Sequence, residues 1–203
     1  YTGSAITLSP TVDFNGSTVT ETTDYTVSFT NNTNAGTASL TITGTGNFTG
    51  TKTVSFTISK ADLSTTSITA IPDQTYTGSS ITISPTVTFN GSTVTETTDY
   101  TVSFTNNTNA GTASLTITGT GNFTGTKTVS FTIVKATPTI TFSDVTKTYG
   151  ESDFDLTATS SSTGAFTYTI ADANVATVTG STTTIVGAGS TSVTVIQAAD
   201  ANY

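Results

Sequence analysis

DYTVSFTNNTNAGTASLTIT, residues 24–43, contains the pattern that decides the fold. Apolar residues occupy every second position on both sides of the turn-forming block NNTNAG. Such alternation is typical of strands that place one face on a core, and no helical period competes with it. A third alternating run, TVSFTI, follows at residues 53–58. The predicted inward-facing residues are Tyr25, Val27, Phe29, Ala38, Leu40, Ile42, Val54, Phe56 and Ile58.

The same stretch returns 75 positions later, within a longer duplication. Residues 1–60 align with residues 76–135 without a gap, and the copies differ at four positions only: Ala5/Ser80, Leu8/Ile83, Asp13/Thr88 and Ser59/Val134. A period of this length indicates tandem folded units. Nothing in the duplicated block NNTNAGTASLTITGTGNFTG suggests a binding site of its own.

Turn signals divide each copy into short strands. Asn15 and Gly16 stand between two short β-prone runs, and Asn-Gly is the strongest short-range signal for a tight β-hairpin. Further Gly and Asn residues recur at spacings near ten. Short strands with regular turns favour an antiparallel sandwich or barrel, in which Tyr25 and its counterpart Tyr100 are candidates for a tyrosine-corner role.

The chain divides into three predicted domains at residues 1–60, 61–135 and 136–203. The last segment is not a third copy, but runs such as AFTYTI alternate in the same way. The connecting sequences SKADLS and VKATPT follow the preceding strands directly, so we expect semi-rigid coupling. No counterpart of residues 61–75 precedes Tyr1, and we therefore expect the opening strand of the first domain to lie outside this segment.

Composition excludes several classes of function. The net charge of −8, with five Lys and no Arg, argues against binding to nucleic acid or to an anionic membrane. No apolar run approaches the roughly 20 residues of a membrane-spanning helix. The chain has no Cys and no His, and the ionisable residues Glu21, Asp24 and Lys52 do not converge in the sequence. We expect neither a disulfide nor an enzyme.

Two sequence signatures resemble known families. The segment from YTGSSITISPTV to GTGNFTGTKTVSFTIVKA (residues 76–136) resembles the immunoglobulin-like repeats of large bacterial surface proteins and adhesins. Residues 140–203, with KTYGESDF and IVGAG, resemble a sister type, the MBG domain. The resemblance implies an all-β fold of tandem immunoglobulin-like antiparallel β-sandwiches in an elongated array, and it carries no catalytic residues.

The resemblance also implies a place and a role. It points to the bacterial cell surface or the extracellular space, and to a structural stalk or spacer in a large surface protein or adhesin. The expected partners are neighbouring domains of the same chain, with host or surface glycans and proteins engaged through other regions. We also consider self-assembly, as a filament protomer joined by strand addition.

A calcium site is the sharpest alternative, since long adhesins often stiffen their connections with carboxylate-bound calcium. In the run GESDFDL, an extended backbone would place Glu151, Asp153 and Asp155 on one face, and hard oxygen ligands suit Ca²⁺. Asp62 and Asp73 near the first connection are weaker candidates. No other cofactor is expected.

Two further alternatives depend on single side chains. Phe48 and its counterpart Phe123 are aromatic residues in predicted loops, which would suit a ligand-binding adhesion module. Lys52 and Lys127 are in phase with apolar strand positions, and some bacterial immunoglobulin-like domains cross-link such a lysine to an asparagine. A strand-end lysine that extends to water is the simpler interpretation.

Overall fold

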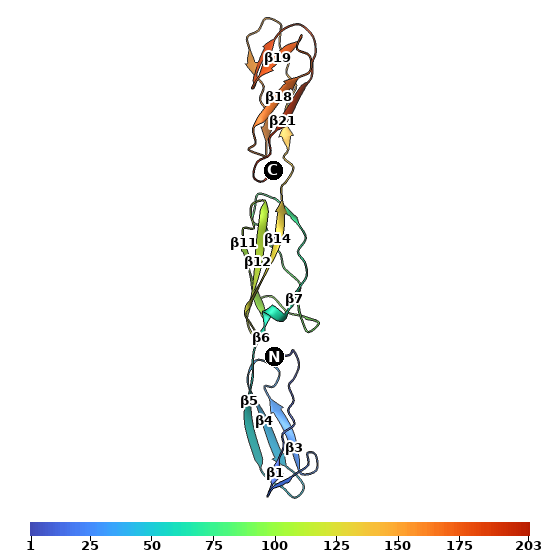
Figure 1. Ribbon diagram of the computed structural model, residues 1–203, viewed down its shortest axis with the longest axis vertical. Coiled ribbons are helices and arrows are strands. Elements are labelled where there is room, and N and C mark those ends of the chain that lie inside the picture. The colour runs from blue at the N-terminus through green and yellow to red at the C-terminus, as the bar shows by residue number, and fades with distance from the viewer. The chain divides into compact units, whose positions relative to one another are not determined.

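The computed structural model describes all 203 residues and is built of β-strands, with one 3-10 turn, η1 (Leu63–Thr65), and no α-helix (Figure 1). The all-β prediction is confirmed. The strands of the first repeat, residues 1–60, are β1 (Asp13–Phe14), β2 (Ser17–Thr18), β3 (Tyr25–Thr30), β4 (Gly36–Gly44) and β5 (Thr51–Ile58). Those of the second repeat, residues 61–135, are β6 (Ala61–Asp62), β7 (Ser67–Ile68), β8 (Gln74–Thr75), β9 (Val87–Phe89), β10 (Ser92–Thr93), β11 (Tyr100–Thr105), β12 (Gly111–Gly119), β13 (Phe123–Thr124) and β14 (Thr126–Val134). The third segment, residues 136–203, holds β15 (Ile140–Thr141), β16 (Phe154–Asp155), β17 (Thr159–Ser160), β18 (Phe166–Ile170), β19 (Ala176–Thr179), β20 (Thr182–Ile185) and β21 (Val193–Gln197).

The residues group into two compact units. The first unit consists of Tyr1–Ile71, Thr82–Thr105 and Ser114–Ser130, and the second of Pro72–Ile81, Asn106–Ala113 and Phe131–Tyr203. The connection at residues 60 and 61 lies inside the first unit, and the connection at residues 135 and 136 lies inside the second. Each connection therefore lies within one compact unit. The division into three domains stays a prediction.

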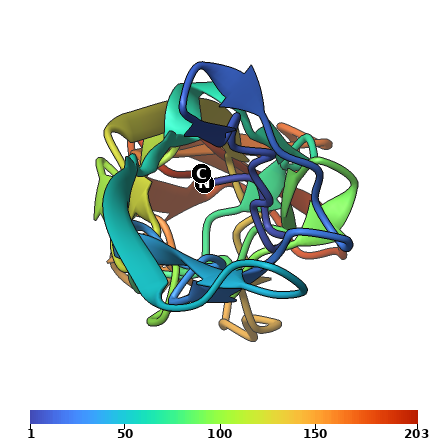
Figure 2. The same ribbon diagram turned by 90° about the horizontal axis from the view of Figure 1, so that it is seen from below.

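The alternating pattern forms the main sheet of the first repeat. Strands β3, β4 and β5 pair antiparallel in that order, with Leu40 opposite both Phe29 and Val54. The predicted inward residues Tyr25, Ala38, Leu40 and Ile58 are buried. Figure 2 shows the dark blue β1–β2 hairpin on the opposite side of the first repeat from β4. The predicted strand faces are confirmed, with one exception.

Val54 is the exception, because its side chain is 50% exposed although its position in the pattern is inward. Its counterpart Val129 is less exposed. In the second repeat Lys127 Nζ donates hydrogen bonds to the backbone oxygens of Ser64 and Thr66, and so fixes η1 against the start of β14. Ser64 and Thr66 belong to the connecting segment 61–75.

The Asn-Gly hairpins form as predicted. β1 and β2 pair antiparallel around Asn15 and Gly16, whose φ angles are 49° and 80°. β9 and β10 pair around Asn90 and Gly91, with φ angles of 49° and 81°. Two successive residues with positive φ are what a type I′ turn requires, and Asn and Gly accept that conformation at low cost.

The tyrosine-corner prediction is matched by two hydrogen bonds. The hydroxyl of Tyr25 donates to the carbonyl of Pro10 at 3.1 Å, and that of Tyr100 donates to Pro85 at 3.2 Å. Burial, followed by the charges of the nearby carboxylates Glu96 and Asp99, raises the pKa of the Tyr100 hydroxyl. Each bond ties the start of a long strand to the segment 15 residues before it.

Two strand pairs differ from the antiparallel expectation. β6 pairs parallel with β13, and β8 pairs parallel with Ile133 and Val134 at the end of β14. Both β6 and β8 belong to the connecting segment 61–75, which runs in the same direction as its partners. The alternation pattern does not reveal strand direction, so these pairs were not foreseen.

The third segment has a separate set of strands. β18 pairs antiparallel with β21, and β20 pairs antiparallel with both β16 and β19. Its buried apolar side chains are those of Leu156, Tyr168 and Ala176. The hydroxyl of Tyr168 accepts a hydrogen bond from the backbone N–H of Ala158 at 3.0 Å. The alternation in AFTYTI is thus realised as β18.

Candidate interdomain contact sites

An aromatic cluster lies at the connection between the first and second repeats. The ring of Tyr1 stacks on Phe89, with centroids 6.1 Å apart, and meets Phe123 edge-on at 5.4 Å. Phe89 and Phe123 are in edge contact with each other at 5.2 Å. The side chain of Phe123 is only 1% exposed. Edge and offset contacts of this kind are favourable beyond the apolar area that they bury.

Asn122, next to Phe123, makes the polar part of this connection. Its side-chain oxygen accepts the backbone N–H of Ala35 at 2.8 Å, and its side-chain nitrogen donates to the Asn34 side chain at 3.1 Å. Its backbone carbonyl accepts the N–H of Ala61 at 3.0 Å, at the first residue after the predicted boundary. One asparagine therefore joins the preceding repeat, the connection and its own repeat.

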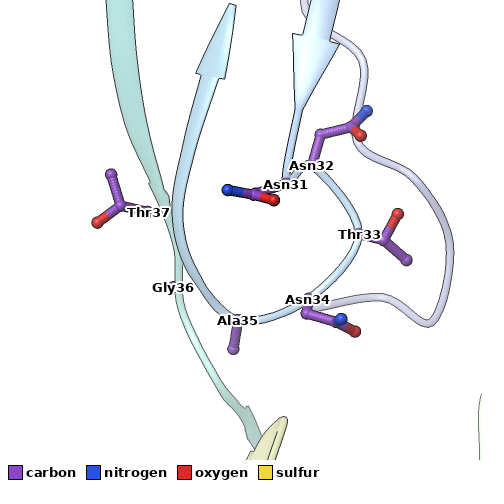
Figure 3. A pocket seen from close by; sticks show the side chains of 7 residues that line it. All are labelled: Asn31, Asn32, Thr33, Asn34, Ala35, Gly36 and Thr37. Carbon is purple, nitrogen blue, oxygen red and sulfur yellow. The ribbon is translucent and has the colours of Figure 1, made fainter.

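The loop that Asn122 contacts, residues 31–37, is held in place by hydrogen bonds within its own repeat. Figure 3 shows this loop turning between β3 and β4, with Asn34 and Ala35 at its tip. Asn32 and Ile6 exchange two hydrogen bonds, from the Ile6 N–H at 2.7 Å and from the Asn32 side chain at 2.8 Å. The N–H of Ala35 is thus presented outward by a braced turn.

The second connection, between the second repeat and the third segment, repeats this arrangement. The Asn202 side chain accepts the N–H of Ala110 at 2.9 Å and donates to Asn109 at 3.2 Å, while its carbonyl accepts the N–H of Ala136 at 3.0 Å. Each of these partners lies 75 positions after its counterpart at the first connection. The ring of Tyr76, the counterpart of Tyr1, meets Tyr203 edge-on at 5.4 Å.

Asp200 holds Asn202 and Tyr203 in position. One oxygen of its carboxylate accepts the backbone N–H groups of both residues at 2.8 Å. The other oxygen accepts the Thr163 N–H at 2.8 Å and the hydroxyls of Ser162 and Thr163 at 2.9 Å each. These hydrogen bonds, that from the Thr163 backbone first, hold the pKa of the Asp200 carboxyl far below its usual range.

The calcium candidates are not gathered into one site. Glu151 forms an ion pair with Lys147, at 3.6 Å. Asp155 accepts hydrogen bonds from Ser181 at 3.2 Å and Thr182 at 2.8 Å. Asp153 is exposed, and the structure contains no group of three or more His, Cys, Asp or Glu residues placed to hold a metal ion. The calcium hypothesis gains no geometric support and stays a prediction.

The other polar candidates have local roles. Asp62 caps η1 by accepting the Ser64 N–H at 2.8 Å. Asp24 accepts the Thr20 N–H at 2.8 Å and closes a turn before β3. Lys52 is exposed, whereas its counterpart Lys127 bonds to backbone carbonyls near η1. Asp73 and Glu21 are exposed.

The duplicated block, in which no binding site is expected, contributes contacts within the chain. The block supplies both halves of the first connection: Asn34 and Ala35 on one side, and Asn122 and Phe123 on the other. A signal was present, because an Asn-aromatic pair stands near the end of all three predicted domains, at residues 47–48, 122–123 and 202–203. Since Asn in a loop is common, that pair indicates a contact only once the folded partners are known.

Comparisons with known proteins do not assign the chain to a family. No protein-family model, no curated protein and no solved structure matches the chain. The structure has no helix with the length and apolar character needed to cross a membrane.

Proposed function

We propose that this chain is a structural spacer, a stalk segment of tandem immunoglobulin-like β-sandwich domains in a large extracellular bacterial surface protein. The observation that carries the proposal is the recurrence of one contact set at both connections, made by Asn122 with Phe123 and by Asn202 with Tyr203. A spacer needs such recurrence, because its length depends on joining successive domains in the same way.

The contacts have the strength to limit bending. An aromatic pair contributes about 0.5 to 1.5 kcal/mol beyond burial, and a hydrogen bond contributes a net 0.5 to 1.5 kcal/mol or so. At the first connection both kinds of contact act together. The link there is short, since β5 ends at Ile58 and β6 begins at Ala61. Each connection is therefore expected to hold one preferred angle while yielding to moderate force.

The chemistry of the chain agrees with a mechanical role. Asp24 closes a turn, Asp62 caps η1, Asp200 fixes the residues around it, and Lys147 pairs with Glu151. Stability is then local to each domain and its nearest neighbour, which lets such a protein lengthen by duplication. The exported bacterial setting rests on the resemblance of the repeats to surface-protein domains and on the acidic, cysteine-free composition.

Small-angle X-ray scattering of the 203-residue chain tests the proposal. Three domains of 25 to 40 Å joined end to end predict a maximum dimension of about 100 Å. The double variant Asn122→Ala with Asn202→Ala should broaden the distribution of interatomic distances, because both connections lose their side-chain hydrogen bonds. Asn47→Ala, in the identical loop of the first repeat, is the matched control and should leave the profile unchanged. A compact, globular profile of the unsubstituted chain would refute the spacer function.

A further inference from the structure

The loop that carries Asn122 packs against a second turn of the same repeat, residues 95–100. The backbone N–H of Thr120 donates to the carbonyl of Asp99 at 2.8 Å. The hydroxyl of Thr120 donates to the carbonyl of Thr98 at 2.9 Å. Two hydrogen bonds from one residue therefore fix the asparagine loop to this turn, two positions before the asparagine itself.

Gly121 allows the loop and the turn to approach each other closely. Its φ angle is 54°, and a Cβ atom at this position would lie 2.8 Å from the carbonyl oxygen of Thr98. A side chain here would strain the backbone and push the loop away from its support. Because Asn122 is the next residue, such a shift would also move its side chain relative to the N–H of Ala35.

The supporting turn is closed by a carboxylate and contains a strained residue. The Asp99 carboxylate accepts the N–H of Thr95 at 2.8 Å, and the Asp99 N–H donates to the Thr95 carbonyl at 2.8 Å. Thr97 has a φ angle of 74°, a conformation that β-branched residues rarely adopt. Such strain persists only where the surrounding structure determines the backbone firmly, and it is concentrated in segments that have a role.

The first repeat has the same support, although its asparagine, Asn47, is exposed. The Thr45 N–H donates to the carbonyl of Asp24 at 2.8 Å, and the Thr45 hydroxyl donates to that of Thr23 at 3.1 Å. Thr22 has a φ angle of 75°. The loop and its supporting turn thus take the same conformation whether or not the asparagine contacts another loop.

The third segment supports its asparagine by a different route. There the carboxylate of Asp200 accepts the N–H of Asn202 directly, at 2.8 Å. In the second repeat the carboxylate of Asp99 acts one step further away, through the turn that it closes. In both cases hydrogen bonds within the same domain hold the asparagine.

We propose that the turn of residues 95–100 positions Asn122 for its contact with Ala35. The positioning residues are Thr98, Asp99, Thr120 and Gly121. An asparagine that is already held in place loses little freedom when it forms the contact, so the contact is more favourable than one made from a mobile loop. This inference rests on the proposed spacer function for its purpose, since a preferred angle between domains requires a fixed asparagine.

Hydrogen exchange at the Ala35 amide, followed by NMR on the alanine-labelled chain, tests the inference. Gly121→Ala and Thr120→Val should each quicken this exchange about threefold to tenfold, and by no more than Asn122→Ala does. Thr120→Ser keeps the hydroxyl and should exchange as the unsubstituted chain does. Adding Gly121→Ala to Asn122→Ala should cause no further change, because the positioning acts only through the asparagine side chain.

The same spectra separate loss of the contact from unfolding. Ala38 and Ala113 are buried in the central strands β4 and β12, so their amides report unfolding of the first and second repeats. Their exchange should stay unchanged in Thr120→Val, which decides the question if Gly121→Ala unfolds the second repeat. Thr45→Val removes the matching hydroxyl of the first repeat and should leave the Ala35 amide unaffected.

Two results would overturn the inference. One is an unchanged Ala35 exchange in Thr120→Val and in folded Gly121→Ala, while Asn122→Ala remains effective. The other is a further increase in the double variant, which would show that Gly121 acts on Ala35 by another route. The spacer function would stand in either case, because it fails only on a compact scattering profile of the unsubstituted chain.

Discussion

Asn122 accepts a hydrogen bond from the backbone N–H of Ala35, a residue 87 positions earlier in the chain. The same relationship joins Asn202 to Ala110, although the sequences around the two asparagines differ. The partner of this bond in each case is a main-chain group at the tip of a braced loop, and a neighbouring asparagine side chain, Asn34 or Asn109, adds a second bond. This geometry makes the connections testable with single substitutions.

Replacing Asn122 by Ala should expose the Ala35 amide. The net value of one hydrogen bond is about 0.5 to 1.5 kcal/mol, so we expect hydrogen exchange at this amide to quicken by up to roughly tenfold. NMR on alanine-labelled protein measures this rate. Asn47→Ala should leave it unchanged, and Ala110, at the other connection, should be unaffected by either change. Equal effects of the two substitutions would contradict the contact.

Phe123 and Phe48 offer a matched pair for stability, because identical sequence surrounds them and their exposure differs. Phe123 is 1% exposed beneath Tyr1, whereas Phe48 is half-buried. We expect Phe123→Ala to lower the free energy of unfolding by about 3 to 5 kcal/mol and Phe48→Ala by about 1 to 2 kcal/mol. Urea denaturation followed by far-UV circular dichroism measures both. A larger loss at Phe48 would show that the aromatic cluster at the connection is misplaced.

Acid should loosen the end of the third segment through Asp200. Its pKa is lowered in the folded chain, so the folded state favours the carboxylate, and the resulting stabilisation is complete above the unfolded value of about 3.9. It is lost as the pH falls from there toward the lowered pKa. Asp200→Asn should remove this part of the pH dependence, which chemical shifts of the Thr163 and Tyr203 amides recorded from neutral pH downward would report. A variant with the unsubstituted pH profile would argue against the prediction.

Calcium should have little effect on thermal stability. Glu151 and Asp155 are engaged with Lys147 and with hydroxyl groups on separate elements, and no three acidic side chains converge. We expect the midpoint of thermal unfolding to be the same in EDTA and in millimolar CaCl₂. A clear rise with calcium that disappears in Glu151→Gln would restore the calcium-binding alternative.

Local signals were sufficient for the strands and hairpins. The period of two in residues 24–43 depends only on neighbours along one strand, and Asn15 with Gly16 sets its turn without help from distant residues. The exposure of Val54 could not be predicted in this way. Its sequence surroundings match those of Val129, yet the two differ in exposure, so the local pattern that they share does not decide it.

The contact sites at the connections could not be predicted from local patterns either, because their partners lie far apart in the sequence. Asn47 and Asn122 stand in identical twenty-residue blocks, yet Asn122 accepts the N–H of Ala35 whereas Asn47 is exposed. The role of each asparagine is set by what lies on the other side of the connection. The parallel pair between β6 and β13 also depends on residues far apart in the sequence, since it joins the start of the second repeat to residues 123 and 124.

The use of the Ala35 and Ala110 main-chain groups at both connections has an evolutionary consequence. A backbone N–H at a loop tip is the same in any sequence that keeps the turn, so a segment of different sequence can be attached if it brings an asparagine followed by an aromatic residue. The third segment, with Asn202 and Tyr203, meets that requirement although it is no copy of the repeats. Recombination between genes could therefore shuffle such modules freely, without a new interface having to be selected at each exchange.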